Sequence, residues 1–504
     1  MADAATETTG ETYDAFAELI RRIANVNAAG GVLRWDQEVM MPDDGIAARA
    51  QQLSTLSSIA HEEFTSEEMG EYLDALEAAD LDDERRAVVR EVRRQYDRKV
   101  RVPTELVQEI SQTTSEAVQT WERAREEDDF DAFAPTLEKL VELNREYAEY
   151  VDPDEDPYAV LFAEYEPYID LETADEILTT LREELVPLVD AVAESDAEVA
   201  VDAFSGEFDV ETQEELARDV LDTLGYDWDR GRLDTAPHPF STGNQFDARV
   251  TTRFDESDPI GALTATIHEF GHASYTLGLP DEHYGTPLGD SRNLTVHESQ
   301  SRLWENHVGR SKAFWERFLP VMKDRFTQID SISTDDAYEA VNQVYDDNFI
   351  RVEADELTYH MHIVLRYEIE KALIHGDLDV EEVPDVWNEK MEEYLGIRPD
   401  TDAEGCLQDI HWSHGSFGYF PTYSLGSVLA AQLYAAAEDD LGELDDRIRE
   451  GEFDPLMDWL RENVHRHGQR YTTPELIERA AGEPYTADHF VEYVTEKYGE
   501  LYEL

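Results

Sequence analysis

The chain has 504 residues, of which 41% are hydrophobic, and it can therefore bury a large core. Its 116 acidic residues outnumber the 41 basic ones, which gives a formal net charge of −75. A surface this acidic repels nucleic acid and anionic lipid, so we exclude both as partners. No apolar run reaches the roughly 18 residues that a membrane span needs.

The composition also indicates the cellular compartment of the protein and the salt concentration there. Its start, Met-Ala-Asp-Ala-Ala-Thr-Glu, is acidic and carries no basic and apolar signal, and Cys406 is the single cysteine. We therefore expect a cytoplasmic protein without an internal disulfide. Only seven of the 41 basic residues are lysines. Because the acids are spread among aromatic and periodic apolar positions, we expect a folded halophilic protein whose charges need molar salt for screening.

Helices are predicted for most of the first 230 residues, where apolar side chains recur at helical spacing. Gly30 and Gly31 are expected to end the first helix, and Pro103 is expected to begin another. The cluster of Trp35 with Met40 and Met41 is typical of a core. The predicted helical segments are residues 13–27, 47–61, 82–128, 130–151, 171–194 and 210–225.

The sequence pattern changes after residue 231. Residues 232–240 and 247–254 are typical of short β-strands, and a Ser/Thr/Gly/Asn turn connects them. An edge strand here could bind an extended peptide through main-chain hydrogen bonds. An ordinary hairpin packed on helices accounts for the pattern equally well.

Residues 268–272 read His-Glu-Phe-Gly-His, with an apolar, helical run before them. Residues four apart share one face of a helix, so His268 and His272 can bind one metal ion. The carboxylate of Glu269 beside them can take a proton from a water at the metal and later pass it to a leaving amine. The pattern therefore predicts a metal-dependent hydrolase.

A catalytic zinc site commonly has three protein ligands and one position for water. The segment His-Glu-Ser-Gln at residues 297–300, in a second predicted helix, can supply the third ligand. We expect this ligand to be Glu298, with His297 as the alternative. The expected metal is Zn²⁺, for which Co²⁺ or Mn²⁺ could substitute at an exposed site.

Residues 311–504 are predicted to be mostly helical, over 311–330, 334–374 and 427–504. An irregular loop at 411–423 contains two histidines, two tyrosines and three other aromatic residues. Loops of this kind often carry function, and phenol and imidazole groups can stabilise an oxyanion.

The sequence resembles the carboxypeptidase Taq family of zinc metallocarboxypeptidases over essentially its whole length. The motifs that carry the resemblance are Trp-Asp-Gln at 35–37, Met-Met-Pro at 40–42, His-Pro-Phe at 238–240, Asp-Ala-Arg-Val-Thr at 247–251, His-Glu-Phe-Gly-His at 268–272, His-Glu-Ser-Gln at 297–300, Ile-Arg-Pro-Asp at 397–400 and Gly-Tyr-Phe-Pro-Thr-Tyr at 418–423.

The resemblance implies a mainly α, zincin-like homodimer with a deep central groove and a small sheet beside the metal helix. It also implies zinc bound by His268, His272 and Glu298, with Glu269 as the general base. The activity implied is the release of single C-terminal amino acids from peptides, with broad specificity.

An exopeptidase needs a cation for the substrate's terminal carboxylate, and arginine suits this by its two-pronged geometry. The candidates, in order, are Arg351, Arg249 and Arg398, although each could equally be a structural ion-pair partner. Three side chains of the aromatic loop complete the predicted site. His414 and Tyr423 resemble the His and Tyr that hold the tetrahedral intermediate in distantly similar helical zinc peptidases, and are therefore expected to be catalytic. Tyr419 is expected to contact the substrate.

Two other functions remain compatible with the sequence: a zinc oligopeptidase of the same helical class that cuts internally, and a zinc-binding scaffold without activity. The intact Glu269 speaks against the scaffold. We expect one domain over 1–504, with a helical N-terminal part (1–230), the β segment and ligand helices (231–310), and a helical C-terminal part with the substrate loop (311–504).

Overall fold

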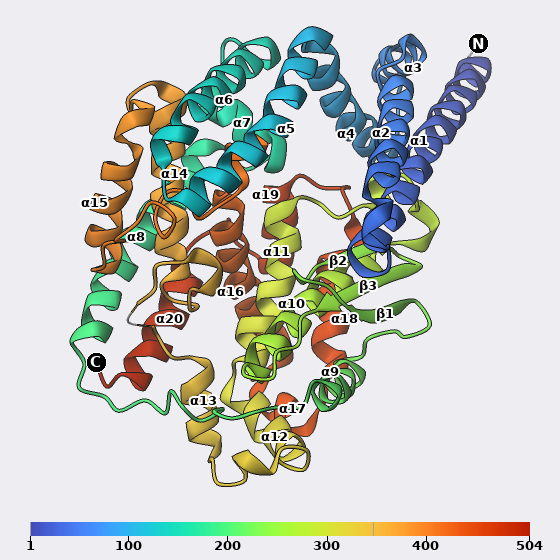
Figure 1. Ribbon diagram of the computed structural model, residues 1–504. Helices are drawn as coiled ribbons and strands as arrows, with labels where there is room; N and C mark the ends of the chain where they lie inside the picture. The colour runs from blue at the N-terminus through green and yellow to red at the C-terminus, as the bar shows by residue number, and fades with distance from the viewer. Residues whose placement is uncertain (1, 346) are drawn as a thin grey trace.

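The computed structural model describes residues 2–345 and 347–504, and most of this chain is helical (Figure 1). Each segment predicted to be helical in the first 230 residues is helical. The first helix extends far beyond the predicted 13–27, residues 82–128 form two helices, and the helices at 67–77 and 157–165 were not predicted. The helices of this part of the chain are labelled in chain order. They are α1 (Ala2–Val39), α2 (Ile46–Phe64), α3 (Glu67–Glu77), α4 (Asp83–Arg101), α5 (Thr104–Glu127), α6 (Phe130–Val151), α7 (Pro157–Tyr165), α8 (Leu171–Glu194) and α9 (Val210–Leu224).

The second half of the chain contains the remaining helices, separated by short 3₁₀ turns and loops. They are α10 (Pro259–Gly278), α11 (Leu294–Arg302), α12 (Lys312–Lys323), α13 (Thr334–Val341), α14 (Tyr359–His375), α15 (Val383–Leu395), α16 (Pro421–Leu441), α17 (Asp445–Glu450), α18 (Asp454–Asn463), α19 (Thr473–Ala481) and α20 (Asp488–Leu501). Within the described ranges, none of these helices is long and apolar enough to cross a membrane.

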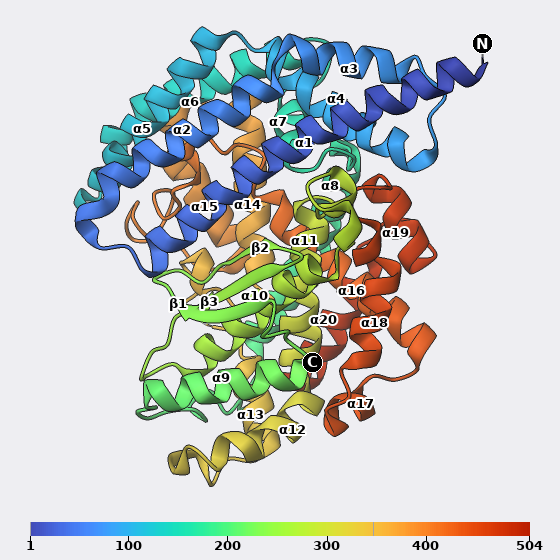
Figure 2. The ribbon, with the colours of Figure 1, turned by 90° about the vertical axis from the view of Figure 1, so that its right-hand side faces the viewer.

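A small sheet lies against α10, as predicted (Figure 2). Its strands β1 (Gly231–Thr235), β2 (Ser241–Asn244) and β3 (Asp247–Thr252) have the order β1-β3-β2. The central strand β3 pairs parallel with β1, where Leu233 faces Val250, and antiparallel with β2, where Thr242 faces Arg249. Together with the helical remainder of the chain, this sheet confirms the predicted fold class.

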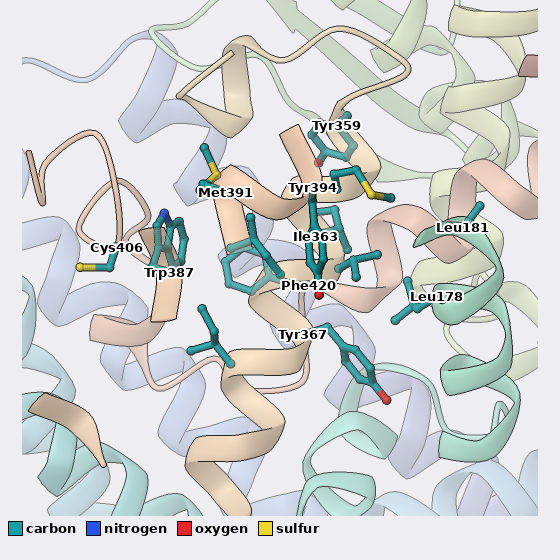
Figure 3. Packing of buried hydrophobic residues seen from close by; sticks show 14 of the residues in the cluster. Leu178, Leu181, Tyr359, Ile363, Tyr367, Trp387, Met391, Tyr394, Cys406 and Phe420 are labelled. Carbon is teal, nitrogen blue, oxygen red and sulfur yellow. The ribbon is translucent and has the colours of Figure 1, made fainter. Parts of the chain in front are cut away.

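Helix α16 lies at the centre of the molecule and is buried on nearly all sides. Its Leu425 and Val428 pack in a core formed mainly by α5–α8, α14, α15 and α20. Its Leu429 and Leu433 pack in a second core, around α9–α12 and the sheet. Figure 3 shows the first core, where Ile363 and other residues of α14 pack toward α8. A helix that is apolar all round is expected in such an interior position.

Several predicted boundaries were wrong. The predicted loop 411–423 ends early, because α16 begins at Pro421, and proline suits the first turn of a helix. Three other differences concern residues 30–31, 241–244 and 342–358. Helix α1 packs on α2 and continues through Gly30 and Gly31, although a mid-helix glycine costs roughly 1 kcal/mol. The expected turn after residue 240 forms strand β2. The predicted helix 334–374 is interrupted between α13 and α14, where the carboxylate of Asp355 accepts hydrogen bonds from the backbone N–H groups of Leu357 and Thr358, both at 2.9 Å.

The Trp-Met cluster is only partly in the core. Trp35 is 6% exposed, and the guanidinium groups of Arg232 and Arg249 lie 4.9 and 4.2 Å from the centre of its ring. Met40 is 55% exposed, because α1 ends at Val39 and the turn that follows faces solvent.

Candidate active site

Helix α10 begins at a strong local signal. The carboxylate of Asp258 accepts a hydrogen bond from the backbone N–H of Gly261 at 2.8 Å, and Pro259 occupies the first turn. The face of α10 that carries Leu263 and Ile267 packs in the core with the sheet. His268 and His272 stay partly exposed on this helix.

Two glycines allow α10, α11 and α16 to approach one another closely. A Cβ atom at Gly271 would lie 2.5 Å from the Cα of Ser301 in α11. A Cβ atom at Gly426 in α16 would lie 2.5 Å from the Cβ of Glu298. Since no real side chain tolerates such distances, glycine at both positions brings α11 and its Glu298 up against the histidine helix.

The donor atoms of His268, His272 and Glu298 converge, and one donor atom from each of the three side chains lies within 4.8 Å of the others. The Oε2 atom of Glu298 lies 3.8 Å from the Nε2 of His268 and 3.5 Å from the Nε2 of His272. Ligands about 2.1 Å from a tetrahedral zinc ion lie about 3.4 Å apart. The three residues are therefore placed to bind one zinc-sized ion together.

Hydrogen bonds to the opposite ring nitrogens fix the orientation of both imidazoles. The Nδ1–H of His272 donates to the carbonyl oxygen of His297 at 3.0 Å, and that of His268 donates to the Oε2 of Glu305 at 2.8 Å. A carbonyl oxygen only accepts, so the neutral His272 ring carries its proton on Nδ1 and leaves Nε2 free for a metal. His297 acts here through its backbone.

Arg302 connects the two buried carboxylates of this centre. Its Nε donates to the Oε1 of Glu298 at 2.7 Å, and its Nη1 donates to the Oε2 of Glu305 at 3.2 Å. Although burial favours the neutral acids, the Arg302 charge keeps the pKa of both carboxyl groups well below the usual range. Because Arg302 occupies Oε1, the Oε2 of Glu298 is the oxygen that faces the histidines.

Glu269 lies beside these residues and is 7% exposed. Burial raises the pKa of its carboxyl group, against the opposing charges of His268 and His272. A carboxylate with a raised pKa is a stronger base than one in water.

The tyrosines of the aromatic loop lie close to this centre. Tyr423 lies one turn before Gly426 on the same face of α16, and Gly426 touches the side chain of Glu298. The rings of Tyr419 and Tyr423 are 5.4 Å apart. Burial raises the pKa of the Tyr423 phenol well above its usual range, with a contribution from the Glu298 charge, so this phenol keeps its proton.

Of the three predicted arginines, Arg351 lies in an aromatic cluster formed by Tyr359, Phe420 and Tyr423. It is 6% exposed, its guanidinium group lies 5.4 Å from the centre of the Tyr423 ring, and its Nη2 donates to Asp409 at 2.7 Å. Arg249 instead pairs with Asp247 at 2.6 Å in β3. Arg398 is exposed and pairs with Glu392 at 3.2 Å.

The two histidines of the loop differ in their surroundings. His414 is exposed at the end of the short helix His411–His414. The ring of His411 lies 4.5 Å from Phe420, 5.5 Å from Tyr419 and 6.5 Å from Tyr423. Burial lowers the pKa of His411 to about 4, so its imidazole is neutral at neutral pH.

Sequence reasoning missed Arg302, Glu305 and His411. A signal for Arg302 was present, because a residue four positions after Glu298 shares its helix face. Glu305 had no such signal, because it reaches His268 from a π-helical segment, Leu303–Gly309, whose extra residue per turn changes which side chains face α10.

Comparison with known proteins agrees with this geometry. The family described as carboxypeptidase Taq (M32) metallopeptidase matches residues 15–498. The chain is 40% identical to thermostable carboxypeptidase 1 of Thermus thermophilus, over 97% of this chain and 99% of that protein. It is also 40% identical to carboxypeptidase 1 of Bacillus subtilis, with the same coverage.

The fold agrees as well. The crystal structure of the M32 carboxypeptidase from Deinococcus radiodurans superposes with a TM-score of 0.95 at 38% identity, over 98% of this chain and all of that one. The chain therefore belongs to the carboxypeptidase Taq (M32) family of metallopeptidases, and it is a metallocarboxypeptidase, a hydrolase that acts on peptide bonds.

Proposed function

We propose that this enzyme releases single amino acids from the C-termini of peptides, with a zinc ion bound by His268, His272 and Glu298 and with Glu269 as the general base. The observation that carries the proposal is the convergence of two oriented Nε2 atoms and one carboxylate oxygen beside a buried, basic carboxylate. When bound, zinc would polarise the scissile carbonyl group and lower the pKa of water.

The proton transfers belong to Glu269. Its buried carboxylate accepts the proton of the attacking water and then donates it to the leaving amine. The raised pKa of Glu269 supports both steps, because the group must be basic enough to take the proton and acidic enough to return it.

Arg351 is the proposed anchor for the substrate's terminal carboxylate. An arginine has five N–H groups. Contacts with Asp409 and the hydroxyl group of Tyr359 use three of them, and the other two can bind a carboxylate. Arg249 and Arg398, which pair with acids outside the aromatic cluster, are weaker candidates.

Tyr423 is the proposed donor to the oxyanion that forms when water adds to the carbonyl group. Tyr419, beside it, is the proposed substrate contact. Among the loop histidines, the ring contacts of His411 favour it as a second donor, while the role of His414 stays a prediction.

A mass-spectrometric time course on an N-acetylated peptide in molar KCl tests this function. A ladder that shortens from the C-terminus and stops with a chelator supports it, whereas internal fragments favour the oligopeptidase and no cleavage with metal bound favours the scaffold. The same peptide with an amidated C-terminus is the matched control, and Arg351→Lys should narrow the rate difference between the two peptides.

Four further predictions stay open: the homodimer, the cytoplasmic location, the adaptation to salt, and the exchange of zinc for Co²⁺ or Mn²⁺. Sedimentation at several protein concentrations tests the first. Metal analysis of enzyme isolated without added metal, followed by reconstitution with each ion, tests the last.

A further inference from the structure

A buried acid outside the metal centre accepts hydrogen bonds from three residues outside its own helix. Glu370 lies in α14 and is 0% exposed. Its Oε1 accepts a hydrogen bond from the Nε1–H of Trp412 at 3.0 Å. Its Oε2 accepts hydrogen bonds from the backbone N–H of Gly418 and from the hydroxyl group of Tyr158 in α7, both at 3.0 Å.

Two of these three donors lie within the aromatic loop. Gly418 has a φ of +84°, and a Cβ atom there would lie 2.8 Å from the backbone nitrogen of Phe162. The loop is therefore held between α14 and the backbone of α7 at this point. Tyr419 is the next residue, and its ring contacts those of Tyr165, at 5.1 Å, and Tyr423, at 5.4 Å.

A carboxylate is the side chain that satisfies this arrangement. The N–H groups of Trp412 and Gly418 can only donate, and they approach different oxygens of Glu370. An amide of the same shape would direct its NH₂ group at one of these two donors. Glutamine therefore cannot reproduce the hydrogen bonds, although it matches glutamate in size.

Keeping an acid here is costly, which suggests that the contact serves more than packing. Burial raises the pKa of Glu370 to about 7, although the donors and the charge of Arg366, one turn earlier on α14, favour the ionised form. Because burying a charge costs free energy, stabilisation of the fold alone is a weak explanation for an acid at this position. The segment that Glu370 holds is the one with the proposed substrate groups.

We propose that Glu370 is a positioning residue of the peptidase. By accepting hydrogen bonds from Trp412 and Gly418, it holds in working geometry the loop that contains Tyr419 and leads into Tyr423 at the start of α16. The inference rests on the proposed function, because it assigns Glu370 to the roles given there to the two tyrosines. Glu370 itself does not touch the substrate.

The first test is Glu370→Gln, assayed on an N-acetylated peptide in molar KCl. We expect kcat to fall at least about tenfold with KM changed less than about threefold, because a loop displaced by a fraction of an ångström misplaces the Tyr423 donor. Zinc content and circular dichroism should match the wild type. Glu368→Gln, on the same helix but paired with Arg182 and Lys390, is the matched control and should leave kcat unchanged.

A second variant covers the case in which Glu370→Gln does not fold. Tyr158→Phe removes one donor to Glu370 and keeps the ring, so we expect a smaller fall in kcat. Its control is Tyr367→Phe, which removes the hydroxyl group of the neighbouring ring, 5.6 Å away and paired with Asp175. Wild-type kcat in every Glu370 or Tyr158 variant that folds would refute the proposal.

Double variants that combine Glu370→Gln or Tyr158→Phe with Tyr423→Phe distinguish a role in positioning Tyr423 from a general loss of rigidity in the protein. If Glu370 acts through the loop, Tyr423→Phe costs less in the Glu370→Gln or Tyr158→Phe background than in the wild type. If Tyr423→Phe lowers kcat and the two effects simply multiply, the proposed function stands and the role of Glu370 is refuted. If Tyr423→Phe alone leaves kcat unchanged, the role of Tyr423 is wrong, and the inference falls with it.

Discussion

The metal centre depends on the close packing of α10 and α11 at Gly271, and Gly271→Ala tests this dependence. The added Cβ atom would lie 2.5 Å from the Cα of Ser301, whereas ordinary contacts begin at 3.4 Å. The Cβ position is fixed by the backbone of α10, and the Cα of Ser301 belongs to the backbone of α11, so no flexible side chain can move aside. The two helices must therefore separate by roughly 1 Å, a displacement that typically costs about 1–3 kcal/mol when a core is overpacked.

The larger effect should fall on the metal. Glu298 lies one turn before Ser301 and moves with it, while His268 and His272 stay on α10. Metal–ligand distances tolerate only about 0.2 Å, so a separation of roughly 1 Å exceeds this limit several times. We expect the zinc affinity to fall at least about tenfold, together with kcat/KM.

The zinc dissociation constant can be measured by competition with a chromophoric chelator, and stability by guanidinium unfolding, both in molar KCl. The control is Gly499→Ala in α20, where an added Cβ atom meets open space. This control should keep the wild-type zinc affinity and gain about 0.5–1 kcal/mol of stability. Wild-type zinc affinity in Gly271→Ala would show that the glycine contact does not set the position of Glu298.

Three further changes have expected outcomes. Glu305→Gln removes the anionic acceptor of His268, so zinc affinity in the same competition assay should fall about 10–100-fold; an unchanged constant would contradict this role. Burial raises the pKa of Glu166 to about 8, so the folded protein holds this proton where the unfolded chain has lost it. The free energy of unfolding should therefore fall by about 1 kcal/mol between pH 7 and 8.5, and Glu166→Gln should remove this part of the pH dependence in denaturant titrations. Dialysis into dilute buffer should loosen the fold as the −75 net charge loses its screening, and unchanged circular dichroism and activity would refute the halophile prediction.

The helices could be predicted because their information is local, whereas the full extent of α1 involves contact with a separate helix. Residues 130–151 and 171–194 have apolar spacing and acidic N-caps, and α6 and α8 begin and end at these residues. The continuation of α1 through Gly30 and Gly31 occurs where α1 packs on α2, and this contact cannot be read from a window of neighbouring residues. The break before α14 did have a local signal, because Asp355 accepts hydrogen bonds from the N–H groups two and three residues after it.

The site divides in the same way. Helix geometry alone places two imidazoles four residues apart on one face. His268 and His272 could therefore be predicted as a pair without knowledge of any contact with another segment. The position of Glu298 depends on Gly271 and Gly426, which appear in the sequence as ordinary small residues and acquire meaning only when three helices approach one another there.

The arginines show why residue type alone could not identify the substrate anchor. In a chain with 116 acids, nearly every arginine can find a carboxylate, so an ion pair does not distinguish a structural arginine from a functional one. Arg249 and Arg398 each pair with an acid nearby in the sequence. Arg351 pairs with Asp409, and this distant contact holds its guanidinium group among the tyrosines of the candidate active site, with N–H groups still available. Arg351 is therefore distinguished by the direction in which Asp409 orients its guanidinium group, and only the folded chain defines this direction.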